Sequence, residues 1–473
     1  MSNKTISTPL AGNKMGVMPV GKLLANMAMP MIIAMLVQAF YNVVDSYFVS
    51  RITQYDGYSD PAVIRESAIA AMSLAFAVQN ILIGFAVGIG VGVNALLSKS
   101  LGEGNQEKAN TAAGNGMTLA VTTTMIFMIF GIVGSRPYFQ MMSNSPLTVD
   151  FGTQYISICC LFSLGIFIEV LAERLLQASG RTMYTMVTQG TGAIINIILD
   201  PLLIFGIGPF PQLGIAGAAV ATVAGQWVAA IMAVIFNIKF NPDVQFRARY
   251  FKLRKDTVGP IMTVGIPAVV MNSIGSVMNV GINKILQGFT QYGEVPVNVF
   301  GIYFKLQSFF FMPLFGMNNA TISIVAFNYG ARKPDRIMKT LKIACASALI
   351  FMLAGLAVFQ VIPGILLGIF DTSADFLALG QRALRIISLC FPFAAVCIAL
   401  GASFQALGNG IYSTIVSLCR QLIVLLPAAF LLSLTGQVNA VWWAFPIAEL
   451  MSLTTTTILF VRIYRQKLKP LMN

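Results

Sequence analysis

The chain has 473 residues, of which 57% are hydrophobic and 10% charged, and its mean hydropathy is +0.79. This composition excludes an ordinary soluble globular domain. The sequence contains no histidine, so histidine metal sites, histidine general bases and Ser-His-Asp triads are excluded, and we do not expect an enzyme. A net charge of +13 is typical either of nucleic-acid binding or of a membrane-topology signal.

Long apolar stretches recur along the chain from Leu24 to about Leu459. A bilayer core of about 30 Å needs roughly 20 apolar residues per helix. We therefore predict an all-α polytopic membrane protein with about twelve transmembrane helices. The predicted spans are 24–50, 66–97, 110–134, 152–176, 183–206, 214–238, 258–287, 295–327, 339–368, 376–401, 411–433 and 439–462. The six cysteines lie inside these apolar stretches, which favours packing over disulfides or a metal site.

Most basic residues fall on one side of the predicted helices, together with the tails 1–23 and 463–473. The positive-inside rule then predicts a bacterial cytoplasmic (inner) membrane protein with both termini in the cytoplasm. The basic excess is explained by this topology and by attraction to anionic lipid head groups. The expected partner is therefore the lipid bilayer and not nucleic acid.

The two halves of the chain repeat a common pattern. The aligned pairs are Gly88 with Gly316, Gly102 with Gly330, and Gln177–Gly180 with Gln405–Gly408, all at one offset. Because each half holds six spans, the copies have the same orientation and are related by a pseudo-two-fold axis along the membrane normal. The predicted organisation is an N-lobe (24–238), a cytoplasmic basic linker (239–257) and a C-lobe (258–462), with a cavity between the lobes.

Polar side chains in the first half lie on single helix faces. Gln38, Asn42 and Asp45 are spaced by four and three residues, and Asn196 and Asp200 lie one turn apart. A charge in hydrocarbon costs roughly 2.5–3.5 kcal/mol on insertion scales, so such groups need a partner or a wet cavity. A carboxylate in a partly dry cavity readily takes up a proton, and with neighbouring oxygens it can instead hold Na⁺. The pattern leaves open which ion binds, and also whether both acids only cap helices or pair with a lysine.

The second half has a polar stripe without an acid. We predict that it forms a wall of the substrate cavity together with Lys305 and, from the first half, Gln38 and Asn42. The stripe consists of Asn272, Ser276, Asn279 and Asn283. Arg420 and Glu449 either pair inside the second bundle or act in substrate binding or gating. Glu169 and Glu173 in the fourth span are either a solvated helix end or an inner gate.

Four segments resemble the multidrug and toxic compound extrusion (MATE) family over essentially the whole chain. They are Ala28–Arg51, Ile194–Gly208, Leu213–Gln226 and Pro313–Arg336. The last is closest to the MepA-like subgroup, and the first-half Asp pattern is similar to the DinF-like branch. The resemblance implies a secondary active antiporter that exports amphipathic cationic small molecules by alternating access. The coupling ion is H⁺ or Na⁺, and no cofactor is implied.

Carried over residue by residue, the resemblance implies an ion-coupling site of Asp45, Asn196, Asp200 and Thr222, with Gln38 facing the substrate cavity. We expect a monomer. The alternative is a flippase of a lipid-linked precursor, which would need a basic cavity that Lys284, Lys305 and Arg420 could provide. A passive channel is disfavoured because no selectivity-filter repeat is present.

Overall fold

The computed structural model describes residues 13–49, 51–52, 60–370 and 373–472, and the side chains of Asn42 and Ser46 lie outside this described part. Every regular element in it is helical. The N-terminal half contains α1 (Lys14–Val17), α2 (Val20–Val49), α3 (Pro61–Gly102), α4 (Gln106–Ile129), α5 (Ser135–Met142), α6 (Pro146–Leu161), α7 (Leu164–Ala178), α8 (Thr182–Phe205) and α9 (Ile215–Phe240). The C-terminal half contains α10 (Lys255–Gln287), α11 (Val295–Gly330), α12 (Pro334–Val361), α13 (Pro363–Gly368), α14 (Ala374–Ser388), α15 (Phe391–Ala406), α16 (Gly410–Leu418), α17 (Leu426–Ser433), α18 (Val438–Val441), α19 (Ala444–Ile463) and α20 (Lys469–Met472). Short π-helical segments occur at Phe130–Gly134, Cys419–Leu425 and Tyr464–Leu468.

The predicted number of transmembrane helices is confirmed. Within the described residues, 10 helices are long and apolar enough to cross a membrane, and two bent pairs bring the total to 12. The bends measure 49° between α6 and α7 and 44° between α14 and α15. Both bent spans are the fourth of their half, so the bend belongs to the repeat.

Several helices extend beyond their predicted ends. Helix α3 begins at Pro61, because the Asp60 side chain accepts a hydrogen bond from Ala62 N and proline fits the first helical turn. It ends at Gly102, just before Gly104, whose φ of 69° lies in the left-handed region. The predicted N-terminal tail is also partly ordered, since the Asn13 side chain caps α1 and α2 already begins at Val20.

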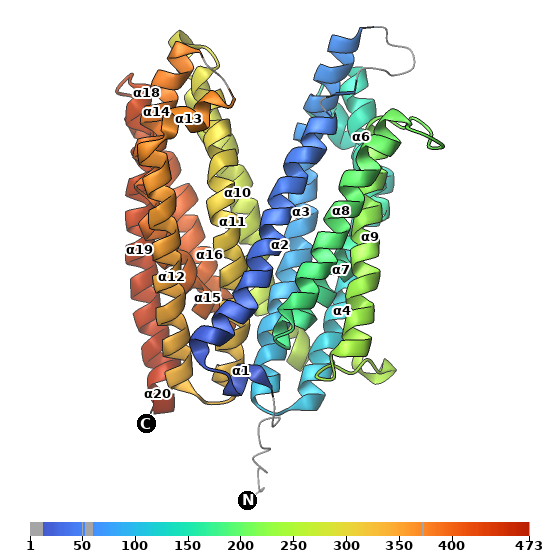
Figure 1. Ribbon diagram of the computed structural model, residues 1–473, viewed down its shortest axis with the longest axis vertical. Helices are drawn as coiled ribbons and strands as arrows, with labels where there is room; N and C mark the ends of the chain where they lie inside the picture. The colour runs from blue at the N-terminus through green and yellow to red at the C-terminus, as the bar shows by residue number, and fades with distance from the viewer. Residues whose placement is uncertain (1–12, 50, 53–59, 371–372, 473) are drawn as a thin grey trace, which may run out of the picture.

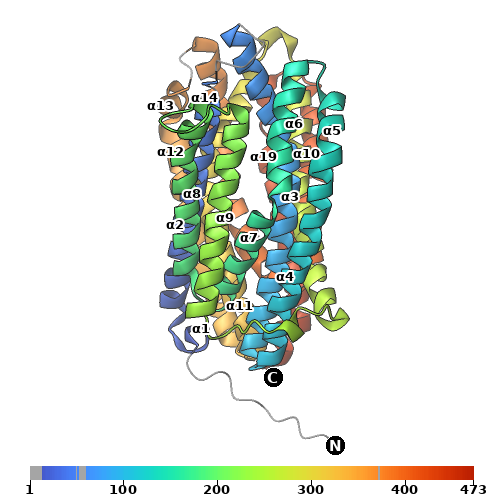
Figure 2. The same ribbon diagram turned by 90° about the vertical axis from the view of Figure 1, so that its right-hand side faces the viewer.

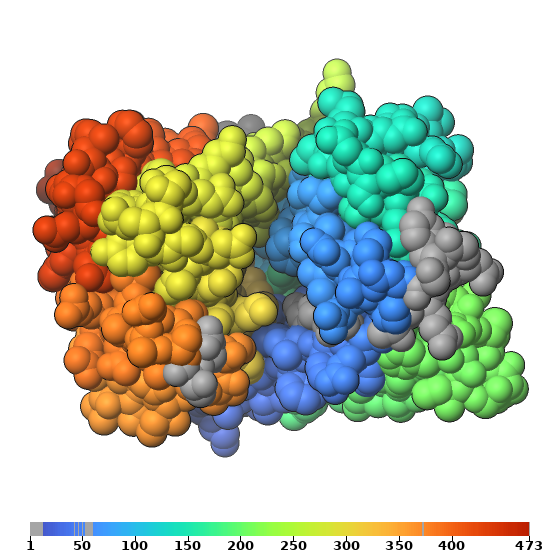
Figure 3. Space-filling view, turned by 90° about the horizontal axis from the view of Figure 1, so that it is seen from above, coloured from blue at the N-terminus to red at the C-terminus, as the bar shows by residue number. Residues whose placement is uncertain are grey.

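The helices form two lobes, an N-lobe of α2–α9 and a C-lobe of α10–α20 (Figure 1). The lobes lie close together near α1 and α20 and diverge toward the opposite end. We refer to these as the terminal end and the open end. Figure 2 views the N-lobe from the side, with α1 at its lower end. Figure 3 looks onto the open end, where the surface is hollowed between the lobes.

The lobes meet where α2 packs against α11 and α3 packs against α10. Glycines allow this close approach. A Cβ on Gly88 would lie 2.7 Å from the carbonyl oxygen of Gly265, and one on Gly316 would lie 2.9 Å from the backbone of Met31. Both distances are too short for a real carbon atom, so the contact requires glycine. Gly88 and Gly316 are an aligned pair of the repeat, and the two contacts are therefore equivalent under the pseudo-two-fold axis.

Helix α1 ties the N-terminal segment to the C-lobe at the terminal end. Met15 is fully buried there, and three C-lobe side chains donate to the α1 backbone. The bonds run from Asn328 Nδ2 to Met15 O (3.2 Å), from Lys333 Nζ to Gly16 O (2.9 Å), and from Arg336 Nη2 to Met15 O (3.0 Å) and Met18 O (2.8 Å). These bonds hold the lobes together at this end.

The basic segment between α9 and α10 is fastened to α4. Asn115 Nδ2 donates to the carbonyl oxygens of Tyr250 (2.9 Å) and Lys252 (3.0 Å), while its Oδ1 accepts from Arg254 N at 2.8 Å. Asn110 Oδ1 likewise accepts from Gln245 N at 2.8 Å. Because these bonds satisfy the backbone of the segment, it is held by the N-lobe as an ordered part of the structure.

Candidate functional site

A cavity lies inside the N-lobe, enclosed by α2, α3, α7, α8 and α9. Its volume is about 150 Å³. The apolar part of its wall includes Met35, Ile83, Val87 and Ile166. The polar side chains that line it are Gln38, Tyr41, Glu169, Glu173, Arg174, Gln177, Gln189, Asn196, Thr222 and Gln226. An apolar wall with a few convergent polar groups is typical of a small-molecule site.

Two aspartates form a buried pair beside this cavity, one helical turn after its lining residues Tyr41 and Asn196. Asp45 on α2 is 8% exposed, and Asp200 on α8 is fully buried. Their carboxyl groups lie within hydrogen-bonding reach of each other, and a hydrogen bond between them requires a proton on one of them. The Oδ1 atom of Asp45 has no partner among the described residues. An oxygen left unsatisfied in a buried site is where a proton or a cation would bind.

Asn196 connects the aspartate pair to α9. In the orientation that pairs donors with acceptors, its Nδ2 donates to Asp200 Oδ2 at 3.2 Å. Its Oδ1 accepts from the hydroxyl (3.3 Å) and the backbone nitrogen (3.1 Å) of Thr222. The four residues that the family resemblance implies for ion coupling are thus brought together. They supply carboxylate, amide and hydroxyl oxygens, a donor set suited to a hard monovalent cation or a proton.

A second acidic group lies deeper in the same cavity, toward the terminal end. Glu173 is 2% exposed and accepts from Thr188 Oγ1 (2.7 Å) and Gln189 Nε2 (2.9 Å). Glu169 lies one turn away, is partly buried and borders the cavity. Both glutamates therefore line the N-lobe cavity.

Arg174 and Tyr41 complete the surroundings of the acids. Arg174 Nη1 donates to Gln177 Oε1 at 2.8 Å, and its charge acts on Glu173. The Tyr41 hydroxyl lies within electrostatic range of Asp45, Asp200 and Glu169. Tyr41 therefore lies near both the aspartate pair and Glu169.

The predicted C-lobe wall residues do not border this cavity. Asn272 is exposed on α10 and donates to the Ala268 carbonyl of its own helix at 3.2 Å, while Lys305 on α11 is exposed. Ser276, Asn279 and Asn283 lie along α10 and are partly exposed. Of the predicted substrate-cavity residues, only Gln38 lines the N-lobe cavity, and Asn42 falls outside the described side chains.

Arg420 and Glu449 form an ion pair inside the C-lobe, with 2.9 Å between Nη1 and Oε1. Glu449 is 7% exposed. Neither residue lines the N-lobe cavity.

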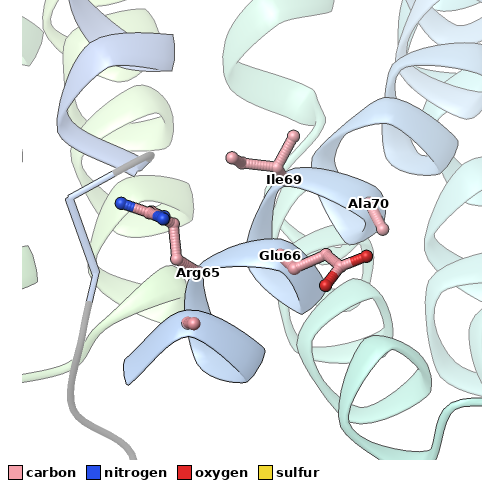
Figure 4. A pocket seen from close by; sticks show the side chains of 5 residues that line it. Arg65, Glu66, Ile69 and Ala70 are labelled. Carbon is pink, nitrogen blue, oxygen red and sulfur yellow. The ribbon is translucent and has the colours of Figure 1, made fainter. Parts of the chain in front are cut away.

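A separate shallow depression lies at the start of α3, near the open end (Figure 4). Arg65, Glu66, Ile69 and Ala70 border it. It is wide open and far along α3 from the acidic groups, so it lacks the enclosure that small-molecule sites have.

Several cavity residues are missing from the sequence-based prediction. Tyr41 lies three residues after Gln38 and four before Asp45, so helical spacing could have placed it on the predicted face. Gln189 lies seven residues before Asn196, and Gln226 lies four residues after Thr222, so the same spacing could have placed both on the faces of the predicted site residues.

A polytopic helical bundle with two repeated lobes and a buried polar cavity is an architecture typical of membrane transporters. The MatE family model matches residues 30–202 and 267–431. The chain therefore belongs to the MatE (multidrug and toxic compound extrusion) family of transporters.

Its relatives are distant but cover nearly the full length. A protein of Shewanella oneidensis named FAD transporter is 24% identical over 434 residues, 92% of each chain. A Staphylococcus aureus protein named multidrug export protein MepA is 24% identical over 451 residues, 95% of each chain. A solved structure described as the outward-facing conformation of a multidrug resistance MATE family transporter superposes with a TM-score of 0.88 at 22% identity. It covers 98% of this chain and 99% of that one.

Proposed function

We propose that this transporter is a secondary active antiporter that exports amphipathic cationic small molecules in exchange for H⁺ or Na⁺. The observation that carries the proposal is the buried pair of Asp45 and Asp200, with an unsatisfied carboxylate oxygen, beside a cavity inside one lobe. Two buried carboxylates that share a proton can change their net charge when an ion binds or leaves. Such a site can couple an ion gradient to a conformational change.

The orientation follows from the basic residues of the terminal end. That end carries the segment between α9 and α10, the start of α12 and the C-terminal residues, all rich in lysine and arginine. The positive-inside rule supports a cytoplasmic terminal end in a bacterial inner membrane. The structure is then closed toward the cytoplasm and open outward, and the aspartate pair lies near the outer end of its lobe.

The cavity supports a cationic substrate. Glu169 and Glu173 face it, and Arg174 is the one cation among its lining residues within the described part of the chain. The apolar wall suits the hydrophobic portion of an amphipathic molecule. The name of the Staphylococcus aureus relative, multidrug export protein, agrees with export of such molecules.

The flippase alternative loses support from the same geometry. Of its three predicted basic groups, Lys284 and Lys305 are exposed on separate helices, and Arg420 is paired with Glu449. An anionic head group would need several unpaired cations in one cavity. The same argument disfavours an anionic flavin nucleotide, the substrate that the name of the Shewanella relative indicates for that protein.

The test is efflux of a fluorescent organic cation from proteoliposomes under an imposed pH or Na⁺ gradient. We expect one gradient to drive efflux in the unaltered protein, and Asp45→Asn and Asp200→Asn each to abolish the gradient dependence. Asp150→Asn is the matched control, because this exposed aspartate only pairs with Arg136 on the surface. If neither gradient drives efflux, or if both cavity variants behave as Asp150→Asn does, the proposal is wrong.

A further inference from the structure

The ion pair of Arg420 and Glu449 lies in the C-lobe interior and is incompletely satisfied. Glu449 is 7% exposed, and its Oε2 atom has no partner among the described residues. Arg420 lies in the π-helical segment Cys419–Leu425, and π-helical segments are frequent at functional sites. If the pair only stabilised the bundle, the second carboxylate oxygen of Glu449 should also have a hydrogen-bond partner.

The position of Arg420 corresponds to a cavity position of the other lobe. Gly192 lies ten residues after Thr182, the first residue of α8. Arg420 likewise lies ten residues after Gly410, the first residue of α16. These are the fifth spans of their lobes. Gly192 lines the N-lobe cavity. At this place the N-lobe has a glycine that borders the cavity and packs against Gly225 and Ala229 of α9. The C-lobe has the larger guanidinium side chain of Arg420 there.

Glu449 also corresponds to a cavity position. Gln226 lies eleven residues after Ile215, where the sixth N-lobe span begins. Glu449 likewise lies eleven residues after Val438, where the sixth C-lobe span begins. Gln226 lines the N-lobe cavity. Both partners of the ion pair thus occupy the places that, in the N-lobe, form the wall of the cavity.

The third correspondence involves the inner acid. Glu169 lies nine residues before Ala178, the last residue of α7. Cys397 likewise lies nine residues before Ala406, the last residue of α15. The hydroxyl of Ser452, which lies one turn after Glu449 on α19, donates to Cys397 Sγ at 3.5 Å, so Cys397 packs against the helix that carries Glu449. The C-lobe therefore has one carboxylate in this place, on its sixth span instead of its fourth.

We propose that the C-lobe contains a latent subsite for an organic cation of the guanidinium or ammonium type, and that the Arg420 side chain occupies it as a tethered cation. Glu449 is the carboxylate of this subsite. The aromatic rings of Tyr303 and Phe445, whose centroids are 6.0 Å apart, lie beside it on α11 and one turn before Glu449, and aromatic walls favour a cation.

Because Arg420 occupies the subsite, the two lobes differ in whether they can bind a free cation. With Arg420 in place, the C-lobe subsite cannot accept a free cation, and only the N-lobe cavity is open to the substrate and coupling ion of the proposed function. The asymmetry of function rests on that proposal, but the latent subsite itself does not. It can be tested without any transport measurement.

The experiment is chemical rescue of Arg420→Ala in the purified full-length protein. Removing the side chain leaves Glu449 buried without its cation, which lowers the thermal unfolding temperature by several degrees. We expect guanidinium chloride at millimolar, non-denaturing concentration to restore most of this loss, while NaCl at equal ionic strength does not. Equilibrium binding of labelled methylguanidinium should show one additional site per chain compared with the unaltered protein.

Two variants isolate the cause. In Arg420→Ala/Glu449→Gln the carboxylate is also removed, so the rescue and the additional site should both disappear. Arg382→Ala removes an exposed arginine of the same lobe and should show no guanidinium effect. The inference is overturned if guanidinium fails to restore Arg420→Ala, or if it restores the double variant equally well.

A complementary variant tests the subsite if Arg420→Ala folds poorly. Glu449→Ala leaves the Arg420 guanidinium without its carboxylate, and formate should then restore stability where chloride does not. If Arg420→Ala cannot be purified, specific rescue of Glu449→Ala by formate supports the subsite, and equal effects of formate and chloride overturn it.

Discussion

Gly102 and Gly330 contact each other's helices reciprocally at the terminal end. A Cβ on Gly102 would overlap the carbonyl oxygen of Phe327, and a Cβ on Gly330 would overlap that of Lys99. Each glycine ends its helix, α3 or α11, and the two are an aligned pair of the repeat. The terminal end is therefore closed by backbone contact across the pseudo-two-fold axis, with no room for a side chain.

We expect Gly330→Ala to oppose this closure. The added Cβ would force α3 and α11 apart, at a cost of about 1–3 kcal/mol by analogy with overpacked cores. Spin labels on the two lobes at the terminal end should report a longer distance, and thermal stability should fall. Gly301→Ala on the same helix is the control, because nothing lies within 4 Å of its Cβ position. Equal behaviour of the two variants would contradict the role of Gly330.

The bonds between α1 and the C-lobe should also bias the closed state. Arg336→Ala removes both hydrogen bonds from this guanidinium to the α1 backbone. Hydrogen bonds to charged groups contribute about 1.5–3 kcal/mol each, so the closed population should fall by at least tenfold relative to the state open at the terminal end. The same spin-label distance measures this shift.

Lys339→Ala is the matched control for Arg336→Ala, since it removes an exposed cation from the same helix α12. A comparable shift in both variants would mean that surface charge, and not the α1 contact, sets the equilibrium.

The hydroxyl of Thr222 should contribute measurably to ion coupling. Thr222→Val keeps the shape of the side chain but removes its hydrogen bond to Asn196, worth about 1 kcal/mol. We expect the apparent affinity for the coupling ion to fall by about fivefold, with the maximal efflux rate retained. The measurement is efflux as a function of ion concentration in proteoliposomes.

Thr185→Val controls for the loss of a buried hydroxyl. The Thr185 side chain is 1% exposed and its Oγ1 has no partner among the described residues, so its removal should leave ion affinity unchanged. If Thr222→Val also leaves the apparent affinity for the coupling ion unchanged, Thr222 is not part of the coupling site.

Glu169 should determine the preference for cations over neutral substrates. Glu169→Gln removes a charge that faces the cavity without disturbing the bonds that hold Glu173. Export of a cationic dye should fall by roughly tenfold, as expected for loss of a buried charge interaction of about 1.4 kcal/mol, while export of a neutral analogue of similar shape changes little. Glu66→Gln, at the exposed depression on α3 (Figure 4), should affect neither.

The sequence predicted much of the architecture because the bilayer imposes simple rules. Twelve spans, two repeated halves and the pairing of Gly88 with Gly316 follow from apolar length and from motif spacing. The bends after α6 and α14 were not predicted, because the breaks near Phe162 and Leu389 lie inside apolar stretches that are long enough to be taken as one continuous span.

The candidate site was predicted only in part. Helical spacing placed Gln38 and Asp45, and Asn196 and Asp200, on shared faces, and the structure brings α2 and α8 together. The stripe from Asn272 to Asn283 obeys the same periodicity, yet it does not border the N-lobe cavity. Periodicity tells which residues share a face, but not which neighbour covers that face.

The sequence by itself determined that this chain crosses a membrane, that its halves are copies and which polar residues share a helix face, because these depend on local length, hydropathy and spacing. Only the tertiary structure decided that a cavity lies within the N-lobe, that Asp45 lies beside Asp200 and that Arg420 pairs with Glu449 inside the C-lobe. These are contacts between residues far apart in the chain, and their geometry depends on how the helices pack around one another.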